Sequence, residues 1–343
     1  MRIRSPRPLL TTLALIAALT ACSTSPPAPV AGAPGSKEKP LELIVFPGGF
    51  NWPVWVAQDK GLFAQNGVTV KITPTPNSVF QLTGLIQGKF DLGMTAIDNL
   101  IAYREGQGEA PIQGPDLVAV MGGDNGFLRL TSVPEVKTIG ELRGKTVSVD
   151  ARTTGYAFVL FEILDRNGLR EPAYSVERAG GVLQRYQALL EKKHAATLLL
   201  SPFEVQAQTR GFNVLADAVT VIGPYQGLVL GTRKSWAEAN RGAVVGFIRA
   251  YPQAVEWLYD PANRAEALQI FIRNQPNATP ASAETAYRVL LDPKDGFTRR
   301  ARIDMEGVRT VLQLRSKWSA SKKPLTDPAK YYDGRFYDEA VRR

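Results

Sequence analysis

The hydrophobic pattern of the chain alternates between short apolar runs and longer stretches with helical spacing. Residues 41–46 (LELIVF) form an apolar run that ends at Pro47-Gly48-Gly49, which predicts a buried strand and a tight turn. Asn51-Trp52-Pro53 is typical of a helix start, because proline is favoured in the first turn after a capping side chain. Residues 68–73 (VTVKIT) alternate as a half-buried strand does. The first unit is therefore predicted as strand, helix, strand.

The same alternation continues in two rounds along the chain. The first round is completed by strands at 90–94 and 117–121 and by helices near 79–87 and from 99. The second round has strands at 127–131, 145–149, 174–178 and 196–200 and helices at 155–167 and 182–192. A strand at 227–231 and helices at 236–259, 264–273, 281–291 and 305–318 follow. Such alternation predicts mostly parallel sheets with helices on both faces.

This order predicts two α/β lobes, the second inserted into the first. Lobe 1 is predicted to comprise residues 41–123 and 226–343, and lobe 2 to comprise residues 124–225. A discontinuous first lobe explains why helical segments follow the second round. Each lobe is then of ordinary domain size.

The segment before residue 41 has the features of an export signal and a tether. Three arginines precede an apolar run at residues 9–19, which is too short for a permanent membrane span. Leu19-Thr20-Ala21-Cys22 resembles the lipobox of bacterial lipoproteins, which implies removal of residues 1–21 as a signal peptide and acylation at Cys22. The alternative is an ordinary secretory signal with an incidental cysteine. Residues 22–40, rich in Pro, Ala and Gly, are predicted to be a disordered linker.

Composition excludes several classes of protein. A single cysteine excludes an internal disulfide, and with a single histidine a soft-ligand metal site is unsupported. The formal net charge of +9 falls by three when the signal is removed, and the remaining basic residues are scattered. We therefore expect no nucleic-acid partner. His194 follows two lysines and is predicted to be exposed, which leaves a Ser-His-Asp relay without its base.

Three short motifs, in the same order, resemble a known family. They are WVAQDKGLFAQNGVTV at 55–70, LIQGKFDLG at 85–93 and LRGKTVSV at 142–149. They resemble the solute-binding proteins of bacterial ABC importers, in the SsuA/TauA/NMT1-like branch that includes nitrate, sulfonate, taurine and thiamine-pyrimidine binders. The chain departs from this family at residues 192–196 (KKHAA), where members often have Gly, an apolar residue and Asp-Ala.

The resemblance implies a periplasmic-binding-protein-like type II fold of class α/β, with two doubly wound lobes joined by two hinge segments near 122–125 and 223–226. It implies capture of a small organic solute, of sulfonate, aromatic or pyrimidine type, in the interlobe cleft and delivery to ABC permease transmembrane subunits. The protein would be anchored at Cys22 on the periplasmic or cell-surface side of a bacterial membrane. We expect a monomer with no catalytic activity, cofactor or metal. The alternatives are a ligand-sensing lipoprotein for a membrane receptor and an enzyme on the same fold.

The candidate pocket follows from strand order, because ligands of open α/β sheets gather at the carboxyl ends of strands. The residues predicted there from lobe 1 are Phe50, Asn51, Trp52, Ser78, Ala96 and Asp98. Those from lobe 2 are Arg152, Thr153, Thr154, Gly155, Tyr156, Gly181, Phe203 and Glu204, and Tyr225 lies at the return crossing.

The stretch 150–156 (DARTTGY) is the strongest candidate for binding an anion. It combines hydroxyls, a cation and the unpaired amides of a helix start, where the helix dipole favours negative charge. Gly155 would let the ligand approach the backbone. The alternatives are that Thr153 or Thr154 only caps its own helix and that Arg152 points to solvent.

Aromatic and acidic residues of this set bear on the rest of the ligand. The aromatic members are Phe50, Trp52, Tyr156, Phe203 and Tyr225. On loops they favour a flat or apolar ligand body, and core packing is the alternative. Asp98 and Glu204 would accept hydrogen bonds from a ligand, but Asp98 could instead cap the helix predicted from Asn99.

Overall fold

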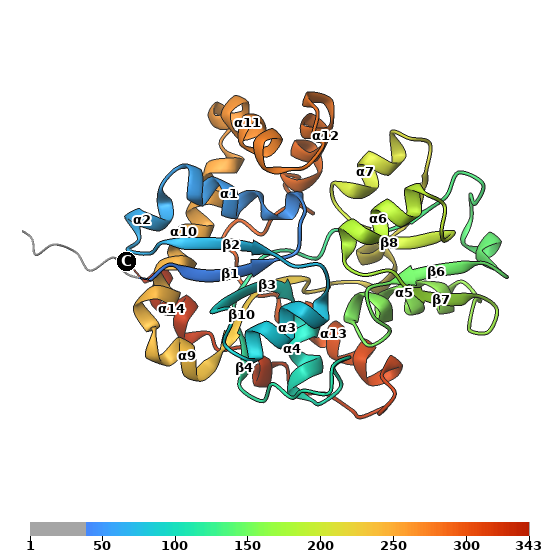
Figure 1. Cartoon of the computed structure of the whole chain (residues 1–343), viewed down its shortest axis with the longest axis horizontal. Coiled ribbons are helices and arrows are strands. Elements are labelled where there is room, and N and C mark those ends of the chain that lie inside the picture. The colour runs from blue at the N-terminus through green and yellow to red at the C-terminus, as the bar shows by residue number, and fades with distance from the viewer. Residues whose placement is uncertain (1–38, 343) are drawn as a thin grey trace, which may run out of the picture. The chain divides into compact units, whose positions relative to one another are not determined.

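A computed structural model describes residues 39–342, so the predictions for the signal peptide, most of the linker and Cys22 lie outside the described residues. The described residues belong to a single compact unit. Their strands form two five-stranded sheets, each flanked by helices (Figure 1). This is the expected α/β class with two lobes, one built on each sheet.

The first sheet has the order β2-β1-β3-β10-β4. Its strands are β1 (Leu41–Val45), β2 (Val70–Pro74), β3 (Leu92–Ala96), β4 (Leu117–Gly122) and β10 (Leu228–Arg233). Strand β1 runs parallel to β2 and β3, whereas β10 runs antiparallel to both β3 and β4. The first residue of β10 therefore lies at the same edge as the carboxyl ends of its neighbours.

The second sheet repeats this arrangement with the order β7-β6-β8-β5-β9. Its strands are β5 (Leu128–Ser132), β6 (Thr146–Val149), β7 (Ser175–Arg178), β8 (Ala196–Leu200) and β9 (Asn213–Asp217). Strand β5 is antiparallel to β8 and β9, and the other pairs are parallel. In each sheet the antiparallel strand is the one by which the chain enters from the other lobe.

Helices connect and cover the strands. Before β10 they are α1 (Trp52–Asp59), α2 (Leu62–Gln65), α3 (Ser78–Ile86), α4 (Ile97–Arg104), α5 (Gly155–Arg166), α6 (Val182–Leu190), α7 (Phe203–Gln208) and α8 (Ala218–Ile222). After β9 and β10 they are α9 (Lys234–Ala239), α10 (Arg241–Tyr259), α11 (Arg264–Asn274), α12 (Pro280–Leu290), α13 (Met305–Trp318) and α14 (Arg335–Val341). Residues 39–342 also contain the 3-10 turns Gly49–Asn51, Ile139–Leu142, Pro261–Asn263 and Pro328–Tyr331.

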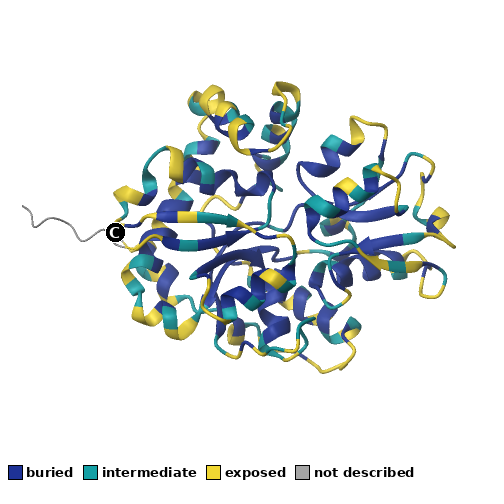
Figure 2. Cartoon of the chain, in the orientation of Figure 1, coloured by how far each residue is buried: buried dark blue, intermediate teal, exposed yellow. Residues whose placement is uncertain are grey.

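The core follows the strands, as the continuous apolar runs predict. Every residue of β3, β4 and β8 is buried, which is typical of strands covered on both faces. Figure 2 shows the buried residues along the strands and on the inner faces of the helices, with exposed residues on the outer faces and loops. The apolar interior thus holds each strand end in a fixed place.

The chain passes between the sheets twice, through residues 123–127 and 223–227. The two crossings are bonded to each other, because Gly227 N–H donates to the Asp124 carbonyl at 3.0 Å. The Gln226 amide also donates to the carbonyls of Asp124 (3.1 Å) and Leu228 (2.8 Å). The first crossing runs from β4 to β5, and the second returns after β9 to β10, so both lie far from the edge strands β2 and β7.

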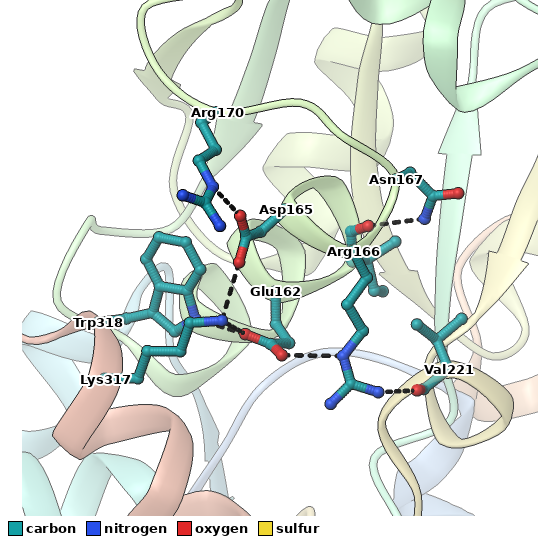
Figure 3. Close-up of polar contacts among 9 residues, drawn as sticks. Glu162, Asp165, Arg166, Asn167, Arg170, Val221, Lys317 and Trp318 are labelled. Carbon is teal, nitrogen blue, oxygen red and sulfur yellow. Dashed lines mark hydrogen bonds and ion pairs between the residues drawn. The ribbon is translucent and has the colours of Figure 1, made fainter.

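Helix α13 contacts α5 of the second lobe although it follows β10 in the chain (Figure 3). Lys317 Nζ donates to Glu162 (2.7 Å) and Asp165 (2.8 Å), and Trp318 Nε1 donates to Glu162 at 2.9 Å. Burial raises the pKa of Glu162, but hydrogen bonds from Lys317, Arg166 and Trp318 lower it overall. This cluster fixes α13 to the inserted lobe.

Several details differ from the sequence expectations. Each sheet contains an antiparallel strand, which apolar periodicity does not reveal because it carries no strand direction. Strand β9 was not predicted, since all of its residues are only partly buried, and α7 and α8 are too short for a periodic signal. The helix predicted over 236–259 is divided near Asn240 into α9 and α10.

Candidate functional site

A cavity between the two lobes is the candidate site. Its lining residues are Phe46, Phe50, Ala96, Asn99 and Leu228 from the first lobe and Asp150, Thr154, Tyr156, Val182, Arg185 and Leu200 from the second. Measured as the space open to the centres of water molecules, its volume is about 40 Å³. A cavity of this size holds a few waters, so a larger solute requires the lobes to adjust.

Strand ends place the apolar part of the lining. Phe46 follows β1, Ala96 ends β3 and Leu200 ends β8, while Leu228 begins the antiparallel strand β10. All four therefore lie at the carboxyl edges of the two sheets, as expected for an open α/β sheet. Together with Phe50 they give the cavity a largely apolar wall, which suits a hydrocarbon or aromatic group.

Arg185 contributes the positive charge of the cavity. It lies in the first turn and a half of α6 and is 4% exposed. Its Nη1 donates to the Gly180 carbonyl at 2.9 Å and its Nη2 to the Leu198 carbonyl at 3.2 Å. Among the described residues, no carboxylate lies within 4.0 Å of it. Burial lowers the pKa of Arg185, and the charge of Asp150 opposes that shift. A buried cation without an ion pair favours an anionic ligand.

Asp150 lines the same cavity, but its charge is partly compensated. Its carboxylate accepts the backbone N–H of Ser78 at 2.9 Å, across the gap between the lobes. Ser78 is the first residue of α3, so Asp150 lies at the positive end of that helix dipole. The cavity therefore holds one cation, Arg185, and one carboxylate, whose charge is offset in part by the Ser78 N–H and the dipole of α3.

The N-terminus of α5 was predicted to bind an anion, but protein groups already occupy it. Thr154 lines the cavity and is the N-cap of α5, accepting the Ala157 N–H at 3.4 Å, so the capping alternative holds for it. A Cβ on Gly155 would lie 2.4 Å from the Cβ of Asp98. The glycine is therefore required by the close approach of α5 to Asp98, which already places a carboxylate beside this helix terminus.

Asp98 forms a buried ion pair with Arg315 of α13. Arg315 Nε donates to Asp98 Oδ1 at 2.7 Å, and its Nη2 donates to Asp98 Oδ2 and, at 2.7 Å, to the Thr153 carbonyl. Asp98 does not cap a helix, because α4 begins at Ile97 with Ala96 as its N-cap. The alternative that Asp98 caps a helix is wrong, and its carboxylate, predicted to bind ligand, is bound by Arg315 within the protein.

Arg315 was missed by sequence reasoning, although its context carried a signal. It lies among the buried residues Leu312 and Leu314 of α13, and its guanidinium is 4.8 Å from the ring of Phe158. An arginine on the apolar face of a helix requires a buried acceptor. Sequence alone does not say that Asp98 is that acceptor.

Four of the predicted ligand residues line the cavity, namely Phe50, Ala96, Thr154 and Tyr156. Trp52 is fully buried instead, with its ring 4.6 Å from that of Phe271 and its Nε1 donating to the Ala267 carbonyl at 3.2 Å. Phe203 packs on Tyr186 at 5.1 Å. Tyr225 lies behind the lining, with its ring 6.3 Å from that of Tyr156.

The polar residues that were predicted to bind ligand lie outside the cavity lining, except for Thr154 and Tyr156. Arg152 is exposed and makes a two-pronged ion pair with Glu171, so it points away from the cavity, as the solvent alternative expects. Asn51 lies at the N-cap position of α1, but its amide donates to the carbonyls of Phe46 (2.6 Å) and Gly48 (3.1 Å) rather than capping the helix.

Glu204 is buried beside the hydroxyl of Ser201, which donates to it. Burial raises the pKa of Glu204 to about 6. Gly181 lies at the lobe interface, where its N–H donates to the Pro76 carbonyl at 3.0 Å. Like Ser78 and Thr153, it belongs to the contact between the lobes rather than to the cavity lining.

His194 is buried, and its predicted exposure is wrong. Its Nε2 lies 2.9 Å from the hydroxyl of Ser148, and the residue is only 3% exposed. Burial, with the nearby Arg185 charge, lowers its pKa to about 4, so the ring is neutral at ordinary pH. The prediction relied on the two preceding lysines, which are exposed, whereas His194 is buried in the bend just before β8.

Arg185, Phe46, Asn99, Val182, Leu200 and Leu228 were not singled out from the sequence as ligand residues. Arg185 carried a usable signal, since it follows Gly180-Gly181 within the first turns of a helix that starts at a strand end. Among residues 39–342, no group of three or more His, Cys, Asp or Glu side chains is placed to hold a metal ion. None of the helices in that range is both long and apolar enough to cross a bilayer.

Comparison with known proteins supports the fold and the family. Residues 51–265 match the family model described as NMT1/THI5 like. A search of curated proteins finds no match. Among solved structures, the ligand-binding component of an ABC-type import system from Staphylococcus aureus, with zinc bound, is similar at a TM-score of 0.71 and 14% identity, covering 89% of this chain and 100% of that one.

Two further structures have the same fold. The aliphatic sulphonate-binding protein SsuA from Escherichia coli gives a TM-score of 0.64 at 17% identity, covering 86% of this chain and 92% of that one. The nitrate-binding protein NrtA from Synechocystis PCC 6803 gives a TM-score of 0.71 at 13% identity, covering 88% of each chain. At these identities the likeness establishes the periplasmic-binding-protein-like fold and leaves the ligand to be argued from the cavity.

Proposed function

The chain belongs to the NMT1/THI5-like family, and from this premise we propose that it is the extracytoplasmic solute-binding component of an ABC importer. It captures a small organic anion between its lobes and delivers it to the transmembrane subunits of the permease. Similar structures include a periplasmic sulphonate-binding protein, a periplasmic nitrate-binding protein and the ligand-binding component of an ABC-type import system, which supports this role.

One observation carries the ligand class, namely the buried guanidinium of Arg185 at a cavity whose wall is largely apolar. A guanidinium binds sulfonate or carboxylate oxygens through paired hydrogen bonds. The lining residues Phe46, Phe50 and Leu228 would contact a hydrocarbon or aromatic body. We therefore place the anionic group at Arg185 and the apolar group against the first lobe. An inorganic anion such as nitrate would leave that apolar wall unused.

Binding is coupled to the relative position of the lobes. Each lobe contributes only part of the lining, so the full set of ligand contacts exists only when the lobes are together. A ligand then shifts the open–closed equilibrium by the difference between its affinities for the two states. This difference would allow the permease to distinguish loaded from empty protein.

A thermal-shift screen tests the ligand class, because a ligand that binds only the folded protein raises its melting temperature. The panel comprises alkanesulfonates, aromatic carboxylates, amino acids, pyrimidines and nitrate. We expect organic sulfonates or carboxylates to raise the melting temperature, and nitrate to have little effect. A response confined to neutral or cationic compounds would contradict the proposal.

We also propose that Cys22 carries the lipid anchor, on the sequence features given above. Cys22→Ser should release the protein from the membrane fraction into the soluble extracytoplasmic fraction, because several acyl chains each contribute about 0.8 kcal/mol per buried methylene. Immunoblots of the separated fractions measure this. Full retention of the variant in membranes would rule out anchoring through this residue.

A further inference from the structure

Two of the contacts between the lobes lie on the side of the cavity away from the crossings. Gly181, which follows β7, donates to Pro76, which follows β2, and Asp150 accepts from Ser78. Because β2 and β7 are the edge strands opposite the crossings, a rotation about the crossings separates these segments most. A side chain that joins the lobes here therefore lies far from the rotation axis, so even a small opening rotation breaks its contact.

Glu109 is such a side chain. It lies in the loop after α4 of the first lobe, and its two carboxylate oxygens bind two residues of the second lobe. Its Oε1 pairs with Arg178 Nη1 at 2.7 Å, and its Oε2 accepts the hydroxyl of Thr153 at 2.9 Å. The carboxylate has no ion-pair partner in its own lobe among the described residues, so both strong contacts of Glu109 depend on the lobes being together.

The partners of Glu109 adjoin the ligand cavity. Thr153 directly precedes Thr154, which lines the cavity, and Arg178 ends β7. Arg178 and Asp150 both line a surface groove of about 570 Å³ beside the cavity, and Asp150 lines the cavity as well. Glu109 itself is not part of the lining. It is therefore placed to join the two halves of the site without touching the ligand.

We propose that Glu109 is a positioning residue of the ligand site, which sets how much of the protein is closed before ligand binds. This role rests on the proposed function, in which closure assembles the site. The side chains of Glu109 and Arg178 are 22% and 55% exposed, so the pair is partly screened by water. With the Thr153 bond, we expect Glu109 to change the ratio of closed to open protein by roughly five- to tenfold.

The chain offers a matched control in Glu171. It also makes a two-pronged contact with an arginine, Arg152, but both residues belong to the second lobe. Losing either glutamate removes a surface ion pair of similar exposure. Only the loss of Glu109 removes a bond between lobes. A role in general stability predicts the same effect of both substitutions, whereas a role in closure does not.

The test measures the distance between the lobes in the full chain without ligand. Spin labels are placed on cysteines introduced at the exposed positions Gln87 and Glu191, in a Cys22→Ser background. Double electron–electron resonance then reports the populations of short and long distances. We expect Glu109→Ala to raise the long-distance population relative to the short one by roughly five- to tenfold, and Glu171→Ala to leave it unchanged. Both variants should melt within a few degrees of each other.

A reciprocal exchange keeps the proposal falsifiable if Glu109→Ala is poorly folded. The double variant Glu109→Arg, Arg178→Glu should recover most of the short-distance population that Glu109→Arg alone loses, because the ion pair is restored with its charges exchanged. Identical distance distributions in wild type and Glu109→Ala, or no recovery in the exchange, would overturn the proposal. Failure of the proposed function would be seen separately, as the lack of any ligand in the thermal-shift screen.

Discussion

At the scale of single residues, the buried carboxylate of Asp124 lies where the two crossings meet. Its Oδ1 accepts the N–H groups of Gly126 (2.7 Å) and Leu228 (3.4 Å), while its Oδ2 is buried with no partner in the described structure. Burial raises the pKa of Asp124 to about 7, although the two N–H bonds oppose the shift. The titratable groups that face it are the phenols of Tyr156 and Tyr251, whose pKa values are also raised by burial.

The raised pKa of Asp124 predicts that the protein loses stability as pH rises. Between pH 3.8, the usual pKa of the group, and about 7, the folded chain keeps a proton on Asp124 that the unfolded chain releases. The free energy of unfolding therefore falls as pH rises through this window, by at most about 4 kcal/mol for a shift of this size. Above about pH 7 the contribution is fully lost.

Urea denaturation of wild type and Asp124→Asn at pH 5 and pH 8 measures this dependence. Asparagine cannot ionise, so the variant should lose less stability than wild type between the two values. Buried His194 contributes the opposite trend, but below pH 6.5, and it is present in both proteins. Equal losses in the two proteins would show that Asp124 does not titrate in this range.

At the scale of elements, α13 holds α4 and α5 together by two kinds of ion pair. Arg315 and Asp98 are fully buried, whereas the side chain of Lys317 is 47% exposed beside Glu162 and Asp165. Removing one partner of a buried pair leaves an uncompensated charge, but an exposed pair is screened by water. The two contacts should therefore differ strongly in their contribution to stability.

We expect Arg315→Met to lower the free energy of unfolding by about 3 to 5 kcal/mol, because Asp98 is left buried and unpaired. Lys317→Met, a control on the same helix, should cost less than about 1 kcal/mol. The double variant Asp98→Leu, Arg315→Met should recover part of the loss, since no charge is then buried. Chemical denaturation compares the variants, and similar losses for Arg315→Met and Lys317→Met would contradict this account.

At the scale of the whole molecule, the order of elements could be predicted from the sequence. Apolar runs such as residues 41–46 and 196–200 are buried strands, because their patterns report burial directly. The reversed direction of β5 and β10 could not be predicted, since apolar periodicity is the same in either direction. Strand β9 was missed because partly exposed edge residues give a weak pattern.

The site was harder to predict than the fold, for a physical reason. Strand ends locate a pocket to within a few residues, which is why Phe50, Ala96, Thr154 and Tyr156 line the cavity. Which charged side chain turns inward depends on contacts far apart in the chain. Arg152 had a nearby partner in Glu171 and turns outward, whereas Arg185 is held by the carbonyls of Gly180 and Leu198 and faces the cavity.

The proposed function predicts that the cavity holds one small organic anion through Arg185. Isothermal titration calorimetry of the sulfonate or carboxylate with the largest thermal shift tests it most directly, in wild type, Arg185→Met and the control Arg152→Met. We predict about one ligand per chain, an affinity at least about tenfold weaker in Arg185→Met, and an unchanged affinity in Arg152→Met. Undiminished binding to a folded Arg185→Met protein would contradict the account.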